Sequence, residues 1–170
     1  MTAWAHRADA PKDVWWLLLD RATERIDLMA FAMQFLPEDN PRLDRLLIAR
    51  ATTGCVIRIA LAEPDGSHVA ERDTEERLGG TMPARIRTTL DHFRPLFGVE
   101  GIELRFYRTP MYDSLFRGDD QMLVTPHLYA LKGYKAPLFH YRRVHDDGIF
   151  DNYLAHFERT WVETTPITAP

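Results

Sequence analysis

The chain has 170 residues, enough for one domain with a substantial buried core. Its 45% hydrophobic and 27% charged residues are typical of a globular protein, and no apolar run reaches the length of a membrane span. The net charge of −4 argues against nucleic-acid binding driven by overall charge. A single cysteine, Cys55, excludes an internal disulfide and, with no signal-peptide pattern at the N-terminus, predicts a cytoplasmic location.

The first half of the chain predicts alternating helices and strands. Asp13–Thr23 places its apolar residues at helical spacing, whereas Arg25–Leu36 is apolar on both alternations, as in a strand buried on both faces. A helix from Pro41 to the terminating Gly54 and a strand at Cys55–Ala62 follow. This order predicts parallel strands joined by a crossover helix.

The second half predicts further strands between two helical regions. Residues 67–97 are helical but interrupted at Gly79-Gly80, and the charged first part has little apolar surface to bury. Two short strands within Met111–Tyr129 meet at a turn at Gly118-Asp119, where both residue types tolerate positive φ. The remaining predicted elements are strands at Ile102–Thr109 and Pro137–His145 and a helix at Gly148–Thr165.

These elements predict an α/β fold with a mixed β-sheet of about six strands, flanked by helices on both faces. We expect one domain over residues 13–165, preceded by an N-terminal extension of residues 1–12 and followed by a tail of residues 166–170.

Several segments carry a resemblance to a known family: Asp13–Trp16, Tyr112–Asp120, Pro126–Tyr129 and Phe157–Trp161. With them, the element order resembles the phospholipase D superfamily, whose active members carry a His-x-Lys-x4-Asp motif on a strand and turn. If Asp120 takes the place of the motif's Asp, its His and Lys positions fall on Asp113 and Leu115. The resemblance therefore implies a phospholipase-D-like domain without the nucleophilic His or the phosphate-binding Lys.

Over its whole length the chain resembles a narrower group, the domains of unclear function that follow helix-turn-helix segments in bacterial regulators. This resemblance implies a regulatory role. Because the sequence begins almost at its first helix, we do not expect direct DNA binding without a separate helix-turn-helix.

Ligands of open α/β sheets gather beyond the carboxyl ends of the strands, so polar side chains at those positions are candidates for binding. The candidate ligand-binding residues are Glu63, Tyr112, Ser114, Arg117, Asp120, His127, Tyr129, His140 and Arg142. Each has a plainer interpretation: the charged turn is a solvated hairpin tip, and the two histidines are hydrogen-bonded core residues.

The same residues allow an enzyme. His127 or His140 would be a general base, and Arg117 or Arg142 would hold an anion. Ser114 would be a nucleophile if a histidine were within reach. No Gly-x-Ser-x-Gly elbow surrounds Ser114, and the histidines lack the spacing of common metal sites. We therefore expect no metal and no cofactor.

Residues 102–143 hold seven basic and four acidic side chains, a local excess of +3 in a chain whose net charge is −4. This bias favours an anionic or phosphate-bearing ligand. We expect a non-catalytic domain that binds such a small molecule and senses or regulates, with an enzyme built on a remodelled site as the alternative. A regulatory protein or a second copy of the chain would be its partner, and no membrane is involved.

Overall fold

The computed structural model describes residues 1–168. It has one eight-stranded sheet in the order β1-β7-β6-β5-β2-β3-β4-β8. The strands are β1 (Thr2–Trp4), β2 (Arg25–Ala30), β3 (Val56–Ala62), β4 (Ile102–Tyr107), β5 (Asp113–Gly118), β6 (Gln121–Pro126), β7 (Leu138–Arg142) and β8 (Thr165–Pro166). The predicted mixed α/β sheet is thus confirmed, with eight strands where about six were expected.

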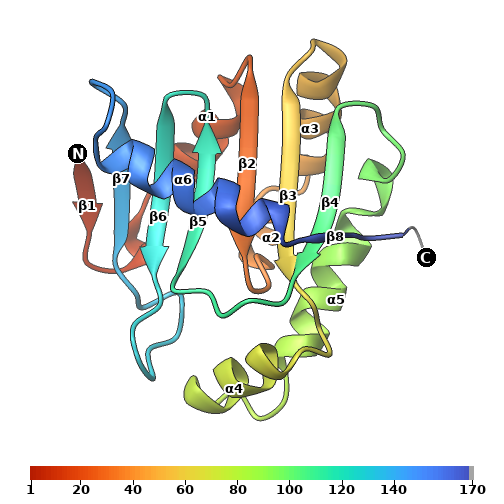
Figure 1. The fold of residues 1–170 in the computed structure, drawn as a ribbon, viewed down its shortest axis with the longest axis vertical. Coiled ribbons are helices and arrows are strands. Elements are labelled where there is room, and N and C mark those ends of the chain that lie inside the picture. Colours follow the sequence, from red (N-terminus) through yellow and green to blue (C-terminus); the bar gives the residue numbers. More distant parts are fainter. Residues whose placement is uncertain (169–170) are drawn as a thin grey trace.

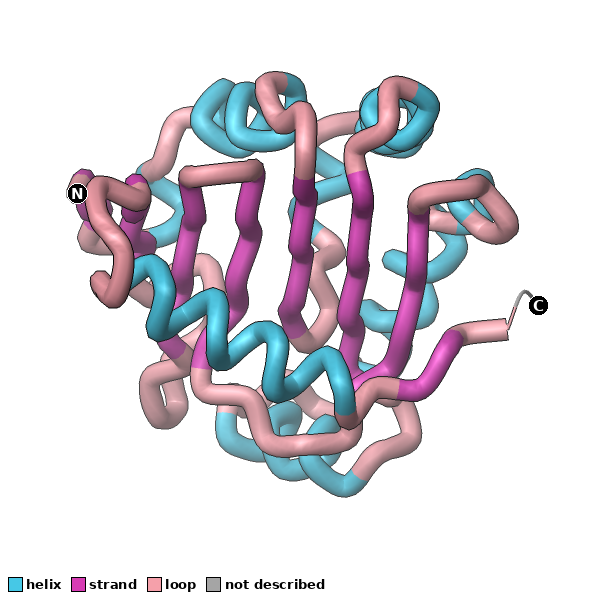
Figure 2. Tube along the Cα trace, turned by 45° about the horizontal axis from the view of Figure 1, so that its top comes forward, coloured by secondary structure: helices cyan, strands magenta, loops and turns pink. Residues whose placement is uncertain are grey.

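Helices cover both faces of the sheet. They are α1 (Lys12–Asp20), α2 (Phe35–Asp39), α3 (Leu43–Thr52), α4 (Ser67–Glu75), α5 (Met82–His92) and α6 (Ile149–Val162), with short 3-10 turns η1 (Arg7–Asp9) and η2 (Arg94–Leu96). The helix α6 crosses one face diagonally, and α1, α3 and α5 lie on the other (Figures 1 and 2). We call these the α6 face and the α1 face.

The two additional strands lie at the sheet edges. The strand β1 pairs antiparallel with β7, and β8 pairs antiparallel with β4. Each has two or three residues, too few for a period-2 pattern to be visible in the sequence. Part of the expected N-terminal extension and of the expected tail therefore belongs to the sheet, while residues 169 and 170 of that tail lie outside the described residues.

The centre of the sheet is parallel and buried, as the apolar runs predicted. The strands β2, β3 and β4 pair in parallel, and Ile26, Leu28, Ile57 and Ile59 are fully buried. The predicted strand Arg25–Leu36 was too long, because β2 ends at Ala30 and the chain turns through Met33, whose φ is +59°, into α2. Apolar residues of this connection pack against the core instead of extending the strand.

The hairpin of β5 and β6 turns at Asp119-Asp120, one residue later than predicted, because Gly118 still pairs with Gln121 as the last residue of β5. Asp119 takes the positive φ, at +49°. Gly118 is needed for space, because a Cβ there would lie 2.2 Å from the carbonyl oxygen of Leu18 in α1. The hairpin thereby docks closely on the first helix.

The strands β2, β3, β4 and β6 all end on the same side of the sheet, so their carboxyl ends form one border of it, perpendicular to the strands. The arrowheads of β3, β4 and β6 point toward the edge beside α4 (Figure 1). Since β5 runs antiparallel to β2 and β6, its first residues lie at this same edge. No described helix is long and apolar enough to cross a membrane.

Candidate functional site

A cavity of about 680 Å³ opens beside the carboxyl ends of β2 and β6. Its lining comes from segments distant in sequence: η1, the turn after β2, the first turns of α5, the start of β5, the end of β6 and the loop before β7. Residues that carry its chemistry are Arg7, Arg85, Ser114, Thr125, His127 and Lys132. A cavity of this size suits a small molecule.

Ser114 and His127 form a hydrogen-bonded pair in the wall of this cavity. Ser114 Oγ lies 2.9 Å from His127 Nε2, and His127 Nδ1 lies 3.1 Å from the carbonyl oxygen of Met111. A carbonyl oxygen can only accept, so Nδ1 carries the imidazole proton. The neutral ring therefore accepts at Nε2 the hydrogen bond that the Ser114 hydroxyl donates.

Burial keeps this imidazole neutral. It lowers the pKa of His127 to about 4, helped by the positive charges of Arg72 and Arg7 and opposed by the hydrogen bond to Met111. His127 also packs against Phe31, with 5.2 Å between ring centroids. At neutral pH the cavity thus presents an uncharged acceptor paired with a serine hydroxyl.

Beside this pair, Thr125 contributes a hydroxyl with unused hydrogen-bonding capacity. Thr125 is the register partner of Ser114 on the adjacent strand, so both side chains leave the same face of the sheet. It is 1% exposed, and its Oγ1 has no hydrogen-bond partner among residues 1–168. A buried polar atom without a partner is costly unless a ligand or water satisfies it.

Three cations line the cavity, Arg7, Arg85 and Lys132. The guanidinium of Arg7 lies 3.8 Å above the centre of the Phe35 ring, and burial lowers its pKa to about 10 despite nearby Glu76 and Asp39. Arg85 and Lys132 are exposed at the rim. In the described part of the chain, none of these three cations forms an ion pair with a carboxylate.

Two carboxylates also line the cavity, and both already have partners. Glu76 accepts a 2.6 Å hydrogen bond from Arg72 Nε, and Glu38 accepts one of 2.7 Å from the amide of Gln34. The lining therefore has three cations against two acids, and the two acids already accept a hydrogen bond, Glu76 from a charged partner and Glu38 from a neutral amide.

Of the predicted site residues, the structure brings together Ser114 and His127. His140 pairs in register with Leu123, roughly 13 Å along the sheet from His127 at about 3.3 Å per residue, and its Nε2 lies 3.0 Å from Gln121 Oε1. Tyr112 and Tyr129, at 74% and 85% exposed, do not line the cavity.

The predicted charged residues form ion pairs elsewhere. Glu63 pairs with Arg108 at 2.6 Å, and Asp120 pairs with Arg142 at 3.3 Å near the hairpin turn. Arg117 points to the α6 face, where its Nη1 donates to Asp27 at 2.9 Å. These residues lie away from the Ser114–His127 pair, and none of them lines its cavity.

Of the six lining residues that carry the chemistry of the cavity, four were not among the sequence candidates: Arg7, Arg85, Thr125 and Lys132. Arg7 reaches the cavity because its backbone N–H bonds to Ala136 O and that of Ala8 to Tyr134 O, long-range contacts that no local pattern reveals. Thr125 carries a usable signal, because it lies next to the carboxyl end of β6, whereas Lys132 lies in the loop between β6 and β7.

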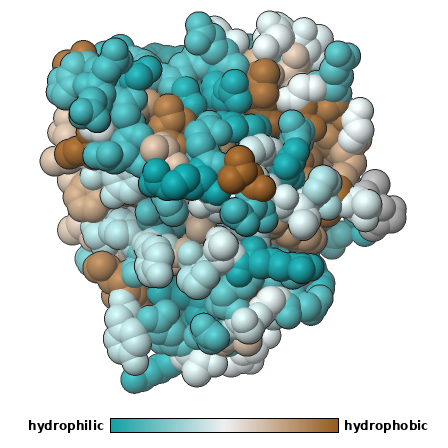
Figure 3. Space-filling view, viewed as in Figure 1, coloured by the Kyte–Doolittle hydropathy of each residue, from teal (hydrophilic) through white to brown (hydrophobic). Residues whose placement is uncertain are grey.

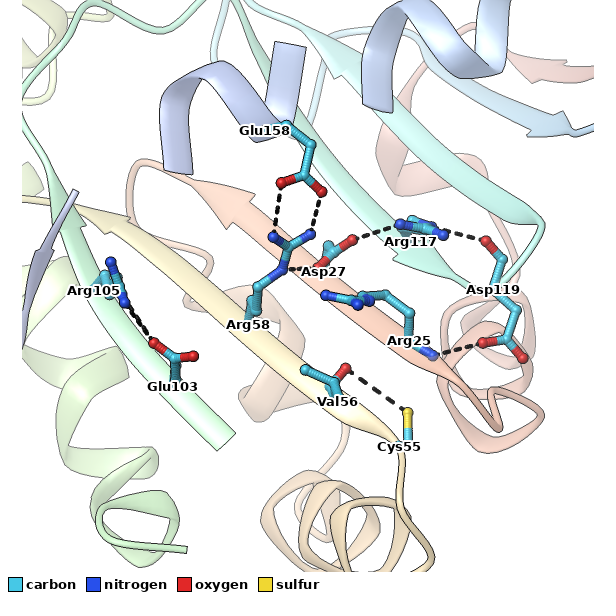
Figure 4. Close-up of polar contacts among 10 residues, drawn as sticks. All are labelled: Arg25, Asp27, Cys55, Val56, Arg58, Glu103, Arg105, Arg117, Asp119 and Glu158. Atoms are coloured by element: carbon cyan, nitrogen blue, oxygen red, sulfur yellow. Dashed lines mark hydrogen bonds and ion pairs between the residues drawn. The ribbon is translucent and has the colours of Figure 1, made fainter. Parts of the chain in front are cut away.

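The α6 face holds a second polar cluster, and it is internally satisfied. Asp27, fully buried, accepts from Arg58 Nε at 2.7 Å and from Arg117, and Arg58 donates two hydrogen bonds to Glu158 of α6 (Figure 4). Arg58 also lies 4.6 Å from the Phe157 ring centre. With each charge paired, this cluster fastens α6 to the sheet and offers little to a ligand.

Among the comparisons with known proteins, only those with solved structures give matches, and these concern the fold. No family model matches the chain, and no curated protein matches it by sequence. Among solved structures it is similar to NUC, a phospholipase D family member from Salmonella typhimurium, with a TM-score of 0.59 and 15% identity over 92% of this chain and 90% of that one.

It is also similar to TrmBL2, an archaeal chromatin protein that shows a novel mode of DNA binding, with a TM-score of 0.58 and 11% identity. The match covers 98% of this chain and 54% of that one, so the chain spans about half the length of TrmBL2. The chain therefore has a phospholipase-D-like fold.

No group of three or more His, Cys, Asp or Glu side chains that could hold a metal ion occurs within residues 1–168.

Proposed function

We propose that this phospholipase-D-like domain binds a small anionic molecule, such as a phosphate-bearing or carboxylate metabolite, in the cavity beside Ser114 and His127. The observation that carries the proposal is the set of cations, Arg7, Arg85 and Lys132, that line it without ion-pair partners in the described chain. Arg7 is half-buried, and although Glu76 and Asp39 are near enough to raise its pKa, neither forms an ion pair with it in the described chain. An anion that pairs with this guanidinium gains both Coulomb energy and hydrogen bonds.

The bound ligand would also bridge two segments that are distant in sequence and already joined by backbone hydrogen bonds. Arg7 belongs to the N-terminal segment, whereas Lys132 and Tyr134 belong to the loop before β7. An anion that contacts both would stabilise this contact relative to the empty state. We propose that the domain reports occupancy in this way to a regulatory protein or to a second copy of the chain.

The likeness to TrmBL2 does not exclude DNA as a partner. The net charge of −4 opposes non-specific binding, and on the α6 face the polar row beneath the helix is already paired. That face is largely hydrophilic, with apolar atoms in separate patches (Figure 3). We prefer the hypothesis that the domain binds a small anion, because Arg7, Arg85 and Lys132 lie around a cavity and lack ion-pair partners in the described chain.

The test is a thermal-shift titration with pyrophosphate and with citrate at constant ionic strength, with duplex DNA as a separate arm. A ligand at a hundred times its Kd stabilises by about 2.7 kcal/mol, which raises the Tm by roughly 5–10 °C for a chain of this size. The Arg7→Met variant keeps an apolar stem over Phe35 and should lose the shift. Arg45→Met, an exposed arginine on α3, is the matched control and should keep it.

An equal shift in all three proteins, or no shift with either anion, would contradict the proposal. A shift with DNA alone that survives Arg7→Met would instead place binding outside the cavity. A second candidate function, catalysis with His127 as general base, has one specific observation in its favour, the Ser114–His127 hydrogen bond.

A further inference from the structure

Ser114 is one of two serines in the chain, and the other provides an internal comparison. Ser67, at the start of α4, is exposed and has no histidine partner among the hydrogen bonds of the described residues. Ser114 is 7% exposed, lines the cavity, and donates its hydroxyl proton to an imidazole that is held by a second hydrogen bond. Ser114, His127 and the carbonyl oxygen of Met111 thus form a hydrogen-bonded series of a nucleophile, a base and a group that orients the base.

The Thr125 hydroxyl supplies a hydrogen-bond donor next to that nucleophile. Its side chain leaves the same face of the sheet as Ser114 at the opposing register position, and its Oγ1 is buried without a partner in residues 1–168. A carbonyl oxygen that gains negative charge during attack by Ser114 Oγ would need such a donor. No contact within the described structure otherwise uses this hydroxyl.

We propose that Ser114 is a nucleophile activated by His127, and that the cavity cleaves carboxylic esters whose acyl or alcohol part carries a negative charge. The assignment of an anionic substrate rests on the proposed anion-binding function, because Arg7, Arg85 and Lys132 are what would orient it. The nucleophile itself rests separately on the geometry of Ser114, His127 and Met111.

The reaction needs no cofactor or co-reactant beyond water. Ser114 Oγ forms a bond to the ester carbonyl carbon while its proton passes to His127 Nε2. The bond to the leaving alcohol then breaks, and His127 returns the proton to that alcohol. Water attacks the acylated serine through the same base, releasing the carboxylic acid and restoring the hydroxyl.

The anionic group has a second effect beyond orientation. Burial is the main cause of the lowered pKa of His127, and the positive charges of Arg72 and Arg7 lower this pKa further. A substrate anion that neutralises Arg7 removes part of this repulsion, so the imidazole becomes a stronger base when the cavity is occupied. Anionic esters should therefore react faster than neutral esters of the same leaving group.

The first experiment measures the nucleophile directly, without relying on anion binding. The purified chain is treated with a fluorophosphonate probe, and labelling is followed by intact mass and peptide mapping. We expect one adduct, on Ser114 and not on Ser67. Ser114→Ala should abolish labelling, Ser67→Ala should leave it unchanged, and His127→Gln should slow it roughly 100-fold.

The second experiment measures enzyme-dependent turnover of 4-nitrophenyl hydrogen adipate against 4-nitrophenyl hexanoate, after subtraction of each ester's spontaneous rate. We expect the anionic ester to be hydrolysed at least about tenfold faster, and Thr125→Val, which removes the hydroxyl at nearly constant volume, to lower kcat by about tenfold or more. Arg7→Met should raise KM for the anionic ester and so reduce the ratio of the anionic-ester rate to the neutral-ester rate. Arg45→Met should match the wild type for both.

The outcomes separate this inference from the proposed function. Anion binding without adducts on Ser114 would overturn the nucleophile and leave the binding function standing. Adducts on Ser114 with no preference for the anionic ester would keep the nucleophile but overturn the assigned substrate class. Equal labelling of Ser67 and Ser114, or labelling that His127→Gln does not slow, would overturn the dyad.

Discussion

At the scale of single residues, the charged cluster on the α6 face is ion-paired, whereas Arg7 on the α1 face has no ion-pair partner in the described chain. On the α6 face, Asp27 is fully buried between Arg58 and Arg117, and Arg58 continues to Glu158 (Figure 4). On the α1 face, Arg7 is desolvated without a carboxylate partner within residues 1–168. The paired charges around Asp27 therefore stabilise the fold, whereas the half-buried guanidinium of Arg7 is available to bind a ligand.

Asp27→Asn should destabilise the fold strongly. The substitution removes the shared negative charge while Arg58 and Arg117 remain, and removing one partner of a buried ion pair typically costs about 3–5 kcal/mol. Chemical denaturation measures the loss. Glu103→Gln, which breaks the more exposed 2.7 Å pair with Arg105, is the control and should cost less than about 1 kcal/mol. Equal losses in the two variants would contradict the importance given to Asp27.

His127 should make stability depend on pH. Its folded pKa of about 4 lies below the value of about 6.5 expected in the unfolded chain, so between these values the unfolded chain binds the proton more tightly. The stability that neutral His127 allows is fully present above pH 6.5. As the pH falls toward 4, the free energy of unfolding decreases by up to about 3 kcal/mol.

Denaturation of the wild type and of His127→Gln at pH 7 and pH 4.5 isolates this contribution, because other titrating groups are common to both. The variant should lose less stability over this interval. A larger or identical loss in the variant would mean that His127 is not held neutral by burial.

At the scale of elements, the β5–β6 hairpin is held at its turn by one carboxylate. Asp119 accepts hydrogen bonds from the backbone N–H groups of Thr23, Glu24 and Arg25 at 2.8–3.0 Å, and from the Thr23 hydroxyl. Partial burial raises the pKa of Asp119, but these backbone donors outweigh it and the pKa is lowered. The turn is therefore tied to the start of β2.

Asp119→Ala should cost about 2–4 kcal/mol, since it frees three backbone donors and places a β-carbon at positive φ without a compensating contact. The neighbouring Asp120→Ala removes an exposed pair with Arg142 and should change stability by no more than about 0.5 kcal/mol. Thermal unfolding of both variants gives the comparison. A smaller loss for Asp119→Ala than for Asp120→Ala would contradict the role of the turn.

Elements with strong local patterns could be predicted from the sequence. The apolar strand β3 and the helix α6 appear where periodicity indicated, and the hairpin turn lies one residue after the position that the turn residues indicated. The edge strands β1 and β8 could not be predicted, because their pairing with β7 and β4 is a long-range event in segments of two or three residues. The end of β2 was placed too late, since apolar residues continue from the strand into the buried turn before α2.

The candidate site was predictable to a smaller extent. Strand order indicated the correct edge of the sheet, and Ser114 and His127 lie there within hydrogen-bond reach. Arg7 could not be found, because only the pairing of the N-terminal segment with residues 134–136 brings it to the cavity. Arg117 was wrongly included among the candidates for this site. It lies three residues after Ser114 on β5, so strand alternation places the two side chains on opposite faces of the sheet.

At the scale of the whole molecule, a local cationic site lies within a chain of net charge −4. The surrounding negative charge lowers the attraction of anions at long range, so binding should depend on short-range contacts within the cavity. Raising the salt concentration from 0.05 to 0.5 M shortens the Debye length from about 14 Å to about 4 Å and should weaken pyrophosphate binding only several-fold. Calorimetric titration at both salt concentrations measures this. A loss of several hundred-fold would indicate binding to dispersed surface charge.

The most direct test of the account is to locate the bound anion. Titration of ¹⁵N-labelled protein with pyrophosphate, followed by two-dimensional NMR, reports which backbone amides sense the ligand. We predict that the shifts centre on Arg7, the segments 31–35 and 132–134, and the region of Ser114, Thr125 and His127. Shifts confined to the α6 face around Arg58 and Arg117, with the cavity amides unchanged, would contradict it.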